Sequence, residues 1–295
     1  MSRSGPAAPR LPPLYPVVYE DLVRDALRED LGRAGDLTTD AVAAPGQRAE
    51  AAVRVRRAGR VAGLEPSLWA FRCLDPAVEI ETLVEDGDDA DAGAVLARLA
   101  GGARQLLSAE RVALNLLGRL CGIATATRDL VRAVEGTQAR IVCTRKTTPL
   151  LRALEKYAVR AGGGVNHRFG LDDAVLIKDN HRVLAGGAAE AVRRARAAVG
   201  HLVKIEIEVD DLAELEEVLE LGADAVLLDN MRPAELRRAV EVVAGRAVTE
   251  ASGGITPATA AEIAATGVDL LSVGWLTHSA PALDVGLDFE ARASL

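Results

Sequence analysis

In the first part of the chain, some segments repeat apolar residues with the period of a strand and others with the period of a helix. Alternating segments at Ala52–Arg56 and Val78–Val84 predict half-buried strands, because successive side chains of a strand point to opposite faces. The segment Tyr19–Leu31 has helical spacing instead, and it ends at Gly32. Strands that follow one another closely in sequence, with helices beside them, predict an open antiparallel sheet covered by helices on one side.

Gly101 and Gly102 mark a change in this pattern. Amphipathic spacing predicts one helix over Ala103–Leu117 and a second over Ile123–Val134. Beyond them, short apolar runs alternate with helical segments, which is typical of parallel strands buried on both faces. The runs are Ile141–Val142, Ala174–Ile177, Leu202–Val209, Ala225–Leu228, Ala247–Thr249 and Leu270–Val273.

This strand–helix alternation predicts a closed or nearly closed parallel α/β barrel, because its units are packed into only about 135 residues. The alternative is an open doubly wound sheet. Such a sheet more often carries the glycine fingerprint of a dinucleotide-binding turn, and the sequence has none.

The composition limits the possible functions. Of 295 residues 49% are hydrophobic, which suits one large α/β domain or two domains, and the formal charge of −8 argues against a general nucleic-acid binder. No apolar run reaches the roughly 18 residues of a membrane span, and the start of the chain lacks the apolar core of a signal peptide. The three cysteines lie far apart and form no Cys-x-x-Cys pair, which favours a reducing, cytoplasmic environment.

Polar residues and glycines follow the apolar runs at their carboxyl ends, where an apolar core would not place them. Because parallel α/β barrels gather their catalytic groups at this edge of the sheet, we expect a functional site there. The segments are Thr144–Thr148, Lys178–His181, Glu206 with Glu208, Asp229–Asn230, Glu250–Gly254 and Gly274–Trp275.

Several of these residues are cations. Arg145, Lys146 and Lys178 follow two of the runs, and the glycine-rich segment 162–168 adds a histidine and an arginine. In an acidic protein such a cluster predicts a strongly anionic substrate, since the cations repel one another until an anion completes the site. Arginine suits a planar carboxylate and lysine suits a phosphate. The alternative is that individual cations pair with surface aspartates.

The turn Ser252-Gly253-Gly254 has the form of a phosphate-binding site. Glycine lets backbone amides approach an anion, and Pro257 near the start of the next predicted helix leaves free N–H groups pointing at it. Gly274 ends the following run, so the two glycine positions belong to the last two strands of the barrel, a common location for a phosphate.

Glu208 and Asp229 are carboxylates at the ends of neighbouring predicted strands. They could bind ribose hydroxyls, hold Mg²⁺ through its waters, or stabilise positive charge on a sugar ring. Glu206 shares the face of Glu208, so alternation does not decide which of the two is functional. Lys204 shares that face as well, which allows a structural Glu206–Lys204 ion pair.

In this order the motifs resemble the quinolinate phosphoribosyltransferase family, also called nicotinate-nucleotide pyrophosphorylase (carboxylating). The resemblance covers nearly all of the chain after residue 16. It is carried by Glu29–Thr39, Ala109–Asn115, Thr144–Pro149, Glu155–Tyr157, His167–Arg168, Leu176–His181, Glu206–Val209, Leu228–Asn230, Glu250–Gly254 and Gly274.

The resemblance implies an α/β fold with an N-terminal open α/β sandwich domain and a C-terminal parallel α/β barrel of the type II phosphoribosyltransferase kind. We expect the sandwich over residues 17–120 and the barrel over 121–275. A flexible arm would precede them at 1–16, and the segment 276–295 would pack back on the sandwich. The family also implies a homodimer, a dimer of dimers or a hexamer, in which Arg111 reaches the site of a neighbouring subunit.

For the site, the resemblance implies a reaction that joins quinolinate to phosphoribosyl pyrophosphate and releases pyrophosphate and CO₂. The product, nicotinate mononucleotide, leads to NAD. The quinolinate-binding set would be Arg111, Arg145, Lys146, His167, Arg168 and Lys178. The set for phosphoribosyl pyrophosphate would be Thr144, Glu208, Asp229, Ser252, Gly253, Gly254, Val273 and Gly274. Mg²⁺ would arrive with that substrate near Glu208 and Asp229, and the catalytic candidates are Lys146, Lys178, Glu208 and Asp229.

Three alternatives stay open. A paralogue of the molybdenum-transport-associated type would share the fold and differ in pyridine specificity, but the full cationic set argues against it. A barrel lyase would use Lys178, crowded by other cations, to form a Schiff base, and would leave Asp229 and Arg111 without a role. A non-enzymatic anion-binding protein would bind its ligand without turnover.

Overall fold

The computed structural model describes residues 11–289 and contains two compact units. The predicted flexible arm, residues 1–16, lies mostly outside the described residues, and residues 11–15 form no helix or strand. The first unit comprises Met1–Thr125, Ala153–Gly162 and Ala280–Leu295, and the second comprises Ala126–Arg152 and Gly163–Ser279.

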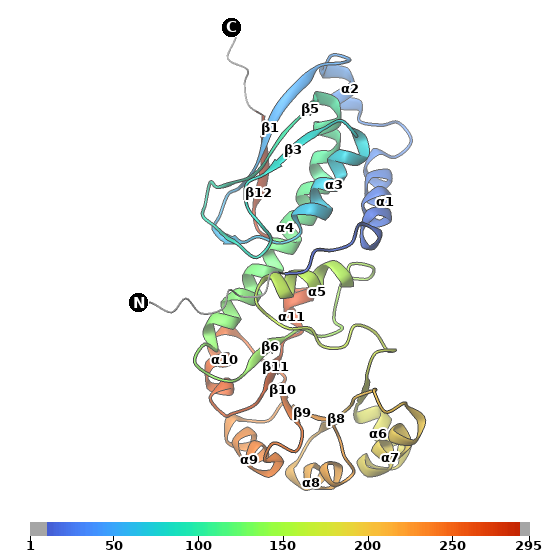
Figure 1. Cartoon of the computed structure of the whole chain (residues 1–295), viewed down its shortest axis with the longest axis vertical. Helices are drawn as coiled ribbons and strands as arrows, with labels where there is room; N and C mark the ends of the chain where they lie inside the picture. Colours follow the sequence, from blue (N-terminus) through green and yellow to red (C-terminus); the bar gives the residue numbers. More distant parts are fainter. Residues whose placement is uncertain (1–10, 290–295) are drawn as a thin grey trace. The chain divides into compact units, whose positions relative to one another are not determined.

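The first unit is built on an antiparallel sheet of four strands in the order β12-β1-β5-β3. Figure 1 shows helices α1, α3 and α4 on one face of this sheet, which confirms the predicted arrangement. Strand β12 belongs to the C-terminal segment and pairs with β1. The elements are η1 (Pro16–Val18), α1 (Glu20–Leu31), α2 (Leu37–Val42), β1 (Arg48–Val55), β2 (Gly59–Arg60), α3 (Leu64–Leu74), β3 (Glu79–Thr82), β4 (Asp89–Ala90), β5 (Val95–Gly102), α4 (Ala103–Ala133), α5 (Arg152–Ala161) and β12 (Val285–Phe289).

Helix α4 runs unbroken over Ala103–Ala133, so the prediction of two separate helices is wrong. Gly118 and Gly122 interrupt the helical pattern, since glycine is a weak helix former. In the fold these glycines allow another segment to approach the helix. A Cβ at Gly122 would lie 2.1 Å from the Pro281 carbonyl oxygen, and one at Gly118 would lie 2.8 Å from that of Leu283.

Helix α5 packs with the first unit, although the sequence analysis assigned its residues to the barrel domain. Glu155 is completely buried and accepts hydrogen bonds from the Arg119 guanidinium at 2.8 and 3.1 Å. The Tyr157 hydroxyl donates to Asp86 at 2.7 Å. These long-range polar contacts fix the helix, and hydrophobic periodicity does not encode them.

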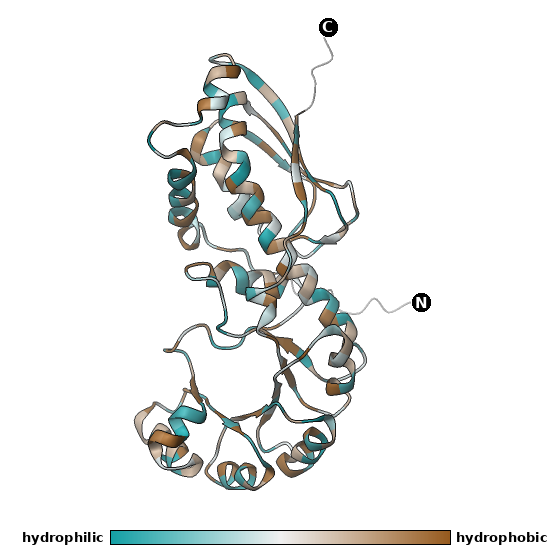
Figure 2. Cartoon of the chain, turned by 180° about the vertical axis from the view of Figure 1, so that it is seen from behind, coloured by the Kyte–Doolittle hydropathy of each residue, from teal (hydrophilic) through white to brown (hydrophobic). Residues whose placement is uncertain are grey.

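The second unit is a parallel sheet of six strands in the order β6-β11-β10-β9-β8-β7. The last strand, β11, pairs with the first, β6, so the sheet curves into the barrel that Figure 2 shows from behind. Within residues 11–289, the isolated bridge Val142↔Val165 extends the β6 edge and β7 forms the other edge, which leaves the barrel nearly closed. Its strands are β6 (Arg140–Val142), β7 (Val175–Ile177), β8 (Ile205–Val209), β9 (Ala225–Asp229), β10 (Val248–Ser252) and β11 (Leu270–Ser272).

Helices surround these strands. The apolar side chains of a strand point outward to the helices, and the alternate side chains point into the barrel. Ile205, Ile207 and Val209 of β8 belong to the apolar core that the helices share. Glu206 and Glu208 alternate with them and therefore point into the barrel. The helices are α6 (Asp179–Ala185), α7 (Ala188–Ala198), α8 (Leu212–Glu220), α9 (Pro233–Val243), α10 (Pro257–Ala264) and α11 (Trp275–His278). In the part of the chain that the structure describes, no helix combines the length and the apolar character needed to cross a membrane.

Candidate active site

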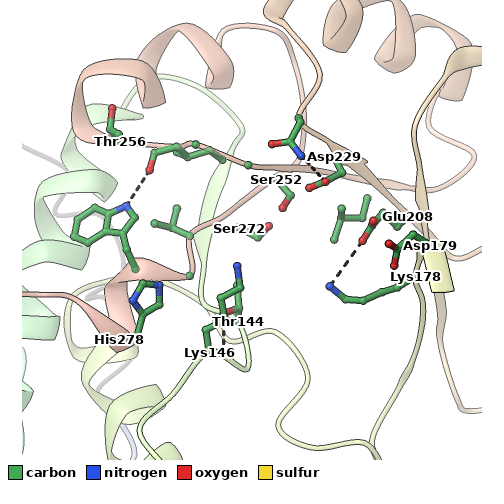
Figure 3. Close-up of a pocket in the computed structure, with 18 residues that line it drawn as sticks. Thr144, Lys146, Lys178, Asp179, Glu208, Asp229, Ser252, Thr256, Ser272 and His278 are labelled. Carbon is green, nitrogen blue, oxygen red and sulfur yellow. Dashed lines mark hydrogen bonds and ion pairs between the residues drawn. The ribbon is translucent and has the colours of Figure 1, made fainter. Parts of the chain in front are cut away.

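A pocket of about 560 Å³ opens at the carboxyl ends of the barrel strands (Figure 3). All strands of the barrel are parallel, so the polar residues that follow them meet at this edge. Ten of the predicted site residues line the pocket: Thr144, Lys146, Lys178, Glu208, Asp229, Ser252, Gly253, Gly254, Val273 and Gly274. Arg111, Arg145, His167 and Arg168 are not among its lining residues.

Glu208 and Asp229 lie on the neighbouring strands β8 and β9, and their carboxylates face the pocket in Figure 3. Burial raises the pKa of Glu208; Lys178 opposes this shift and Asp229 adds to it. A cation or a pair of hydroxyl groups bound here would relieve the repulsion between the two acids. The Lys178 ammonium lies 3.8 Å from Glu208, so its neighbour is an acid and not the crowd of cations that the Schiff-base alternative requires.

The Ser252-Gly253-Gly254 turn lines the pocket next to Asp229, because Ser252 of β10 is in register with Asp229 of β9. Gly253 and Gly254 have φ angles of +97° and +61°, which side chains other than glycine rarely adopt. A Cβ at Gly253 would lie 2.0 Å from the Asn230 amide oxygen. The turn therefore needs glycine both for its backbone conformation and for its close approach to the end of β9.

The side chain of Lys146 lies against Gly274 and extends into the pocket. A Cβ at position 274 would lie 2.9 Å from Cδ of Lys146, so only glycine leaves this path open. The Lys146 backbone is held on both sides, because its N–H donates to the Thr144 hydroxyl at 3.0 Å and its carbonyl accepts from the Thr277 hydroxyl at 2.8 Å. Thr144 thus supports the loop as well as lining the pocket.

Sequence reasoning missed several residues of the pocket lining. Trp275 received no role, yet its indole N–H donates to the Ile255 carbonyl at 2.9 Å and ties α11 to the glycine turn. Thr256 and His278 also line the pocket. The place of Thr256, just before the helix-starting proline, was a usable signal for a helix N-cap, whereas nothing in the pattern marks His278.

Arg145 and Arg168 form a second cationic group. The parallel bridge between Val142 and Val165 brings their two segments together, and Arg145 is close enough to Arg168 to act on it electrostatically. Burial lowers the pKa of Arg168, and the neighbouring Arg145 lowers it further. The Nε atoms of both arginines are buried without a hydrogen-bond partner among the described residues. Two guanidinium groups with unused donors in one place are a site for an anion.

His167 and Glu206 pair with each other inside the barrel. The His167 Nε2 lies 2.8 Å from a Glu206 carboxylate oxygen, so the expected Glu206–Lys204 ion pair is wrong. Lys204 binds Asp224 at 2.7 Å instead. Glu206 is buried with its histidine, while Glu208 lines the pocket, which separates two residues that alternation alone could not distinguish.

Arg111 lies on α4 in the first unit. Its side chain is 64% exposed, and its guanidinium is 3.9 Å from Glu110. An exposed ion pair at this distance contributes little to stability, so the Arg111 guanidinium is available to another partner.

Comparisons with known proteins give one consistent result. Models of the N-terminal and C-terminal domains of quinolinate phosphoribosyl transferase match residues 36–121 and 123–288. The probable nicotinate-nucleotide pyrophosphorylase [carboxylating] of Bacillus subtilis is 46% identical over 260 residues, which cover 88% of this chain and 89% of that protein. The nicotinate-nucleotide pyrophosphorylase [carboxylating] of Mycobacterium leprae is 44% identical over 276 residues, covering 91% of this chain and 96% of the relative.

Solved structures agree. The nicotinate-nucleotide pyrophosphorylase from Francisella tularensis superposes with a TM-score of 0.90 at 36% identity, over 96% of this chain and all of that one. The similarity therefore extends across both units of the molecule.

Proposed function

The chain belongs to the quinolinate phosphoribosyltransferase family, and from this premise we propose that it makes nicotinate mononucleotide from quinolinate and phosphoribosyl pyrophosphate, with loss of pyrophosphate and CO₂. The proposal is carried by one observation, namely that the candidate site contains separate groups of residues suited to a phosphate, a ribose and a dicarboxylate. A glycine turn suited to a phosphate, an acid pair suited to a ribose, and two lysines share one pocket. Arg145 and Arg168, which are half-buried and whose Nε donors have no partner among the described residues, complete the cationic set.

The 5′-phosphate of the sugar substrate would bind at Ser252, Gly253 and Gly254, where backbone amides can approach an anion closely, and at Gly274. Glu208 and Asp229 would accept hydrogen bonds from the ribose hydroxyls. The same carboxylates would stabilise the positive charge that develops on the ribosyl carbon as pyrophosphate leaves.

Quinolinate carries two carboxylates on a planar ring. Arg145 and Arg168 suit it, because a guanidinium donates two parallel hydrogen bonds to a carboxylate. Lys146 and Lys178 would contribute point charges, and His167, next to Arg168 in the chain, belongs to the same loop. These contacts would hold the ring nitrogen in line with the ribosyl carbon, and such positioning supplies much of the acceleration of a two-substrate reaction.

The bond changes need few protein groups. The ring nitrogen forms a bond to the ribosyl carbon as the bond to pyrophosphate breaks, which makes the nitrogen a pyridinium. The bond between C2 and its carboxylate then breaks, CO₂ departs, and the pyridinium accepts the electron pair, which a proton finally captures at C2. The cations of the chain stabilise the negative charge on the departing pyrophosphate, whereas CO₂ leaves as a neutral molecule and its electron pair goes to the pyridinium.

Mg²⁺ fits the acid pair. Glu208 and Asp229 supply hard oxygen ligands, and burial together with Asp229 raises the pKa of Glu208 although Lys178 opposes it, so a cation here would be stabilising. When bound with phosphoribosyl pyrophosphate, Mg²⁺ would neutralise part of the charge on the departing pyrophosphate.

We also propose that the working unit is a homodimer or a larger assembly of dimers, with Arg111 of one subunit completing the quinolinate site of the other. The support is the exposed guanidinium of Arg111 and the family resemblance around it. A cytoplasmic location is part of the proposal, since Cys73, Cys121 and Cys143 are free thiols.

The test is incubation of the purified protein with phosphoribosyl pyrophosphate, Mg²⁺ and either quinolinate or nicotinate. We expect nicotinate mononucleotide from quinolinate, with kcat/KM at least about a hundredfold above that for nicotinate, since nicotinate lacks the second carboxylate with which the cations of the site would pair. No product from quinolinate, or equal use of nicotinate, would contradict the proposal.

A further inference from the structure

The glycine turn leaves its own hydrogen-bond donors unused. Within residues 11–289, no group accepts a hydrogen bond from the backbone N–H of Gly253, Gly254 or Ile255. Three successive N–H groups beside a pocket suit an anion, but they do nothing to fix the conformation of the turn before the anion binds. Other contacts must therefore hold the turn in place.

One hydrogen bond holds each end of the turn. At its start, the Asn230 backbone N–H donates to the Ser252 carbonyl at 2.9 Å. At its end, the Trp275 indole N–H donates to the Ile255 carbonyl, also at 2.9 Å. The first bond joins two backbone groups, whereas the second depends on a single side chain. A substitution of Trp275 can therefore release one end of the turn.

The surroundings of Trp275 hold its indole in place. The ring is partly buried and packs against the apolar core of the barrel. The next residue, Leu276, is completely buried, and the Thr277 hydroxyl donates to the Lys146 carbonyl at 2.8 Å. The acceptor is equally protected, since Ile255 is only 4% exposed and water does not easily replace the indole there. The bond thus joins two groups that are both fixed before any ligand binds.

The second tryptophan of the chain differs from Trp275 in this respect. The ring of Trp69 on α3 meets the ring of Tyr19 edge to face, with the centroids 6.2 Å apart. Its buried indole N–H has no hydrogen-bond partner among the described residues. Trp69 therefore contributes only its ring, while Trp275 contributes its ring and a donor. The same substitution at both positions separates these two contributions.

The bond lies on one side of the pocket. Figure 3 shows Thr256 and His278 on the side away from Glu208. Thr256 follows Ile255 in the chain, and His278 belongs to the same short helix as Trp275. A change in the bond should consequently affect the phosphate end of the pocket and leave the acid at its other end in place.

We propose that Trp275 is a positioning residue, which holds the glycine turn ready for the 5′-phosphate of the sugar substrate through its bond to the Ile255 carbonyl. A turn that already has its bound conformation loses less conformational entropy on binding, which increases affinity. The indole N–H is occupied by the protein, so Trp275 acts through the turn. The inference rests on the proposed function in one respect, namely that the phosphate belongs to phosphoribosyl pyrophosphate.

The kinetic test compares Trp275→Phe with the control Trp69→Phe. Trp275→Phe keeps an aromatic ring and removes the donor, so KM for phosphoribosyl pyrophosphate should rise about three- to tenfold, the net effect of one hydrogen bond. Both kcat and KM for quinolinate should stay within about twofold, as should all three constants in Trp69→Phe. An unchanged KM for phosphoribosyl pyrophosphate in Trp275→Phe, or an equal rise of both KM values, would overturn the positioning role.

The binding test needs no turnover. Ribose 5-phosphate carries the phosphate without the pyrophosphate, and isothermal titration calorimetry measures its Kd. Trp275→Phe should raise this Kd about three- to tenfold, while Trp69→Phe should leave it unchanged. Equal Kd values in the wild type and Trp275→Phe, or no binding to the wild type, would overturn the proposal.

The two tests together separate this proposal from the proposed function. The expected Kd pattern without formation of nicotinate mononucleotide by the wild type would contradict the proposed function and support the role of Trp275. Turnover by the wild type, with wild-type Kd and KM values in Trp275→Phe, would do the reverse.

A second variant covers the case in which Trp275→Phe does not fold. An amino acid with benzothiophene in place of indole keeps the two-ring shape, but a sulfur that cannot donate replaces the N–H. Incorporated at position 275, it should raise the Kd for ribose 5-phosphate about three- to tenfold. A wild-type Kd in this variant would show that the indole N–H does not position the turn.

Discussion

The two ends of the barrel use charged residues in opposite ways. At the amino ends of the strands, Asp224 accepts hydrogen bonds from Lys204, Arg196 and the Ile205 backbone, so its charge is balanced within the chain. At the carboxyl ends, Glu208 and Asp229 face an open pocket. Charge alone therefore does not mark a functional site. What marks it is charge that the protein leaves for a ligand.

The largest expected effect comes from the carboxyl end. Asp229→Asn keeps the shape of the side chain but removes the charge that would stabilise the ribosyl carbon. We expect kcat to fall about 10²–10³-fold, with the free energy of unfolding within about 0.5 kcal/mol of the wild type. Steady-state kinetics and urea unfolding measure both. If Asp229→Asn instead lowered the free energy of unfolding by more than about 1 kcal/mol and left kcat unchanged, Asp229 would be a structural residue and not part of the site.

The next effect tests whether a second copy completes the pocket. Arg111→Ala and Lys178→Ala should each be inactive. A mixture that exchanges subunits should recover roughly a quarter of wild-type activity, since half of the dimers are mixed and each mixed dimer has one intact site. Subunit exchange is verified independently with differently tagged chains. Continued inactivity after verified exchange would show that Arg111 acts within its own chain.

A smaller effect separates strain from binding. Gly253→Ala places a methyl group against Asn230 at a φ of +97°, whereas Gly222→Ala has a similar φ of +76° and no atom within 4 Å of the new methyl. Gly222→Ala should lose about 1 kcal/mol of stability from backbone strain alone, and Gly253→Ala should lose more because of the added clash with Asn230. Only Gly253→Ala should raise KM for phosphoribosyl pyrophosphate, by about tenfold. Equal KM values in the two variants would show that the glycine turn does not bind phosphoribosyl pyrophosphate.

The smallest effect on activity belongs to the amino end. Burial alone would raise the pKa of Asp224, but the hydrogen bonds from Lys204, the Ile205 N–H and Arg196 lower it to about 2. Asp224→Asn should cost about 1–2 kcal/mol of unfolding free energy at pH 7 and leave kcat/KM within about twofold.

The sign of the pH dependence follows from the lowered pKa. The stability from Asp224 is present above its unfolded pKa of about 4 and is lost as pH falls toward 2, so the wild type and the variant should converge there. A tenfold loss of activity in the folded variant would contradict the division between the two ends.

The barrel was predictable from the sequence because its signals are local. Each strand contributes an apolar run, and for three of the runs the residue that follows lines the pocket, so Lys178, Asp229 and Gly274 could be placed from their positions alone. The glycine turn was equally visible, since its spacing before Pro257 encodes both a turn and a helix start.

The errors have a common cause, which is contact between distant segments. The glycines that interrupt the helical pattern of α4, Gly118 and Gly122, make room for residues 281–283, which are distant in the sequence. Likewise, the partner of Glu206 is His167, which lies 39 residues away in the sequence. The alternation that places Glu206 and Lys204 on one face of the strand gives no indication of this distant partner. Periodicity indicates which face of an element is buried, but not what covers it.

The most direct test of the central claim is the stoichiometry of a single reaction. Quinolinate labelled at the C2 carboxylate is incubated with the protein, phosphoribosyl pyrophosphate and Mg²⁺, and labelled CO₂ is counted against nicotinate mononucleotide. We expect equal amounts of the two products and no labelled CO₂ when phosphoribosyl pyrophosphate is left out. Labelled CO₂ without the sugar substrate, or a phosphoribosyl product that keeps the label, would contradict it.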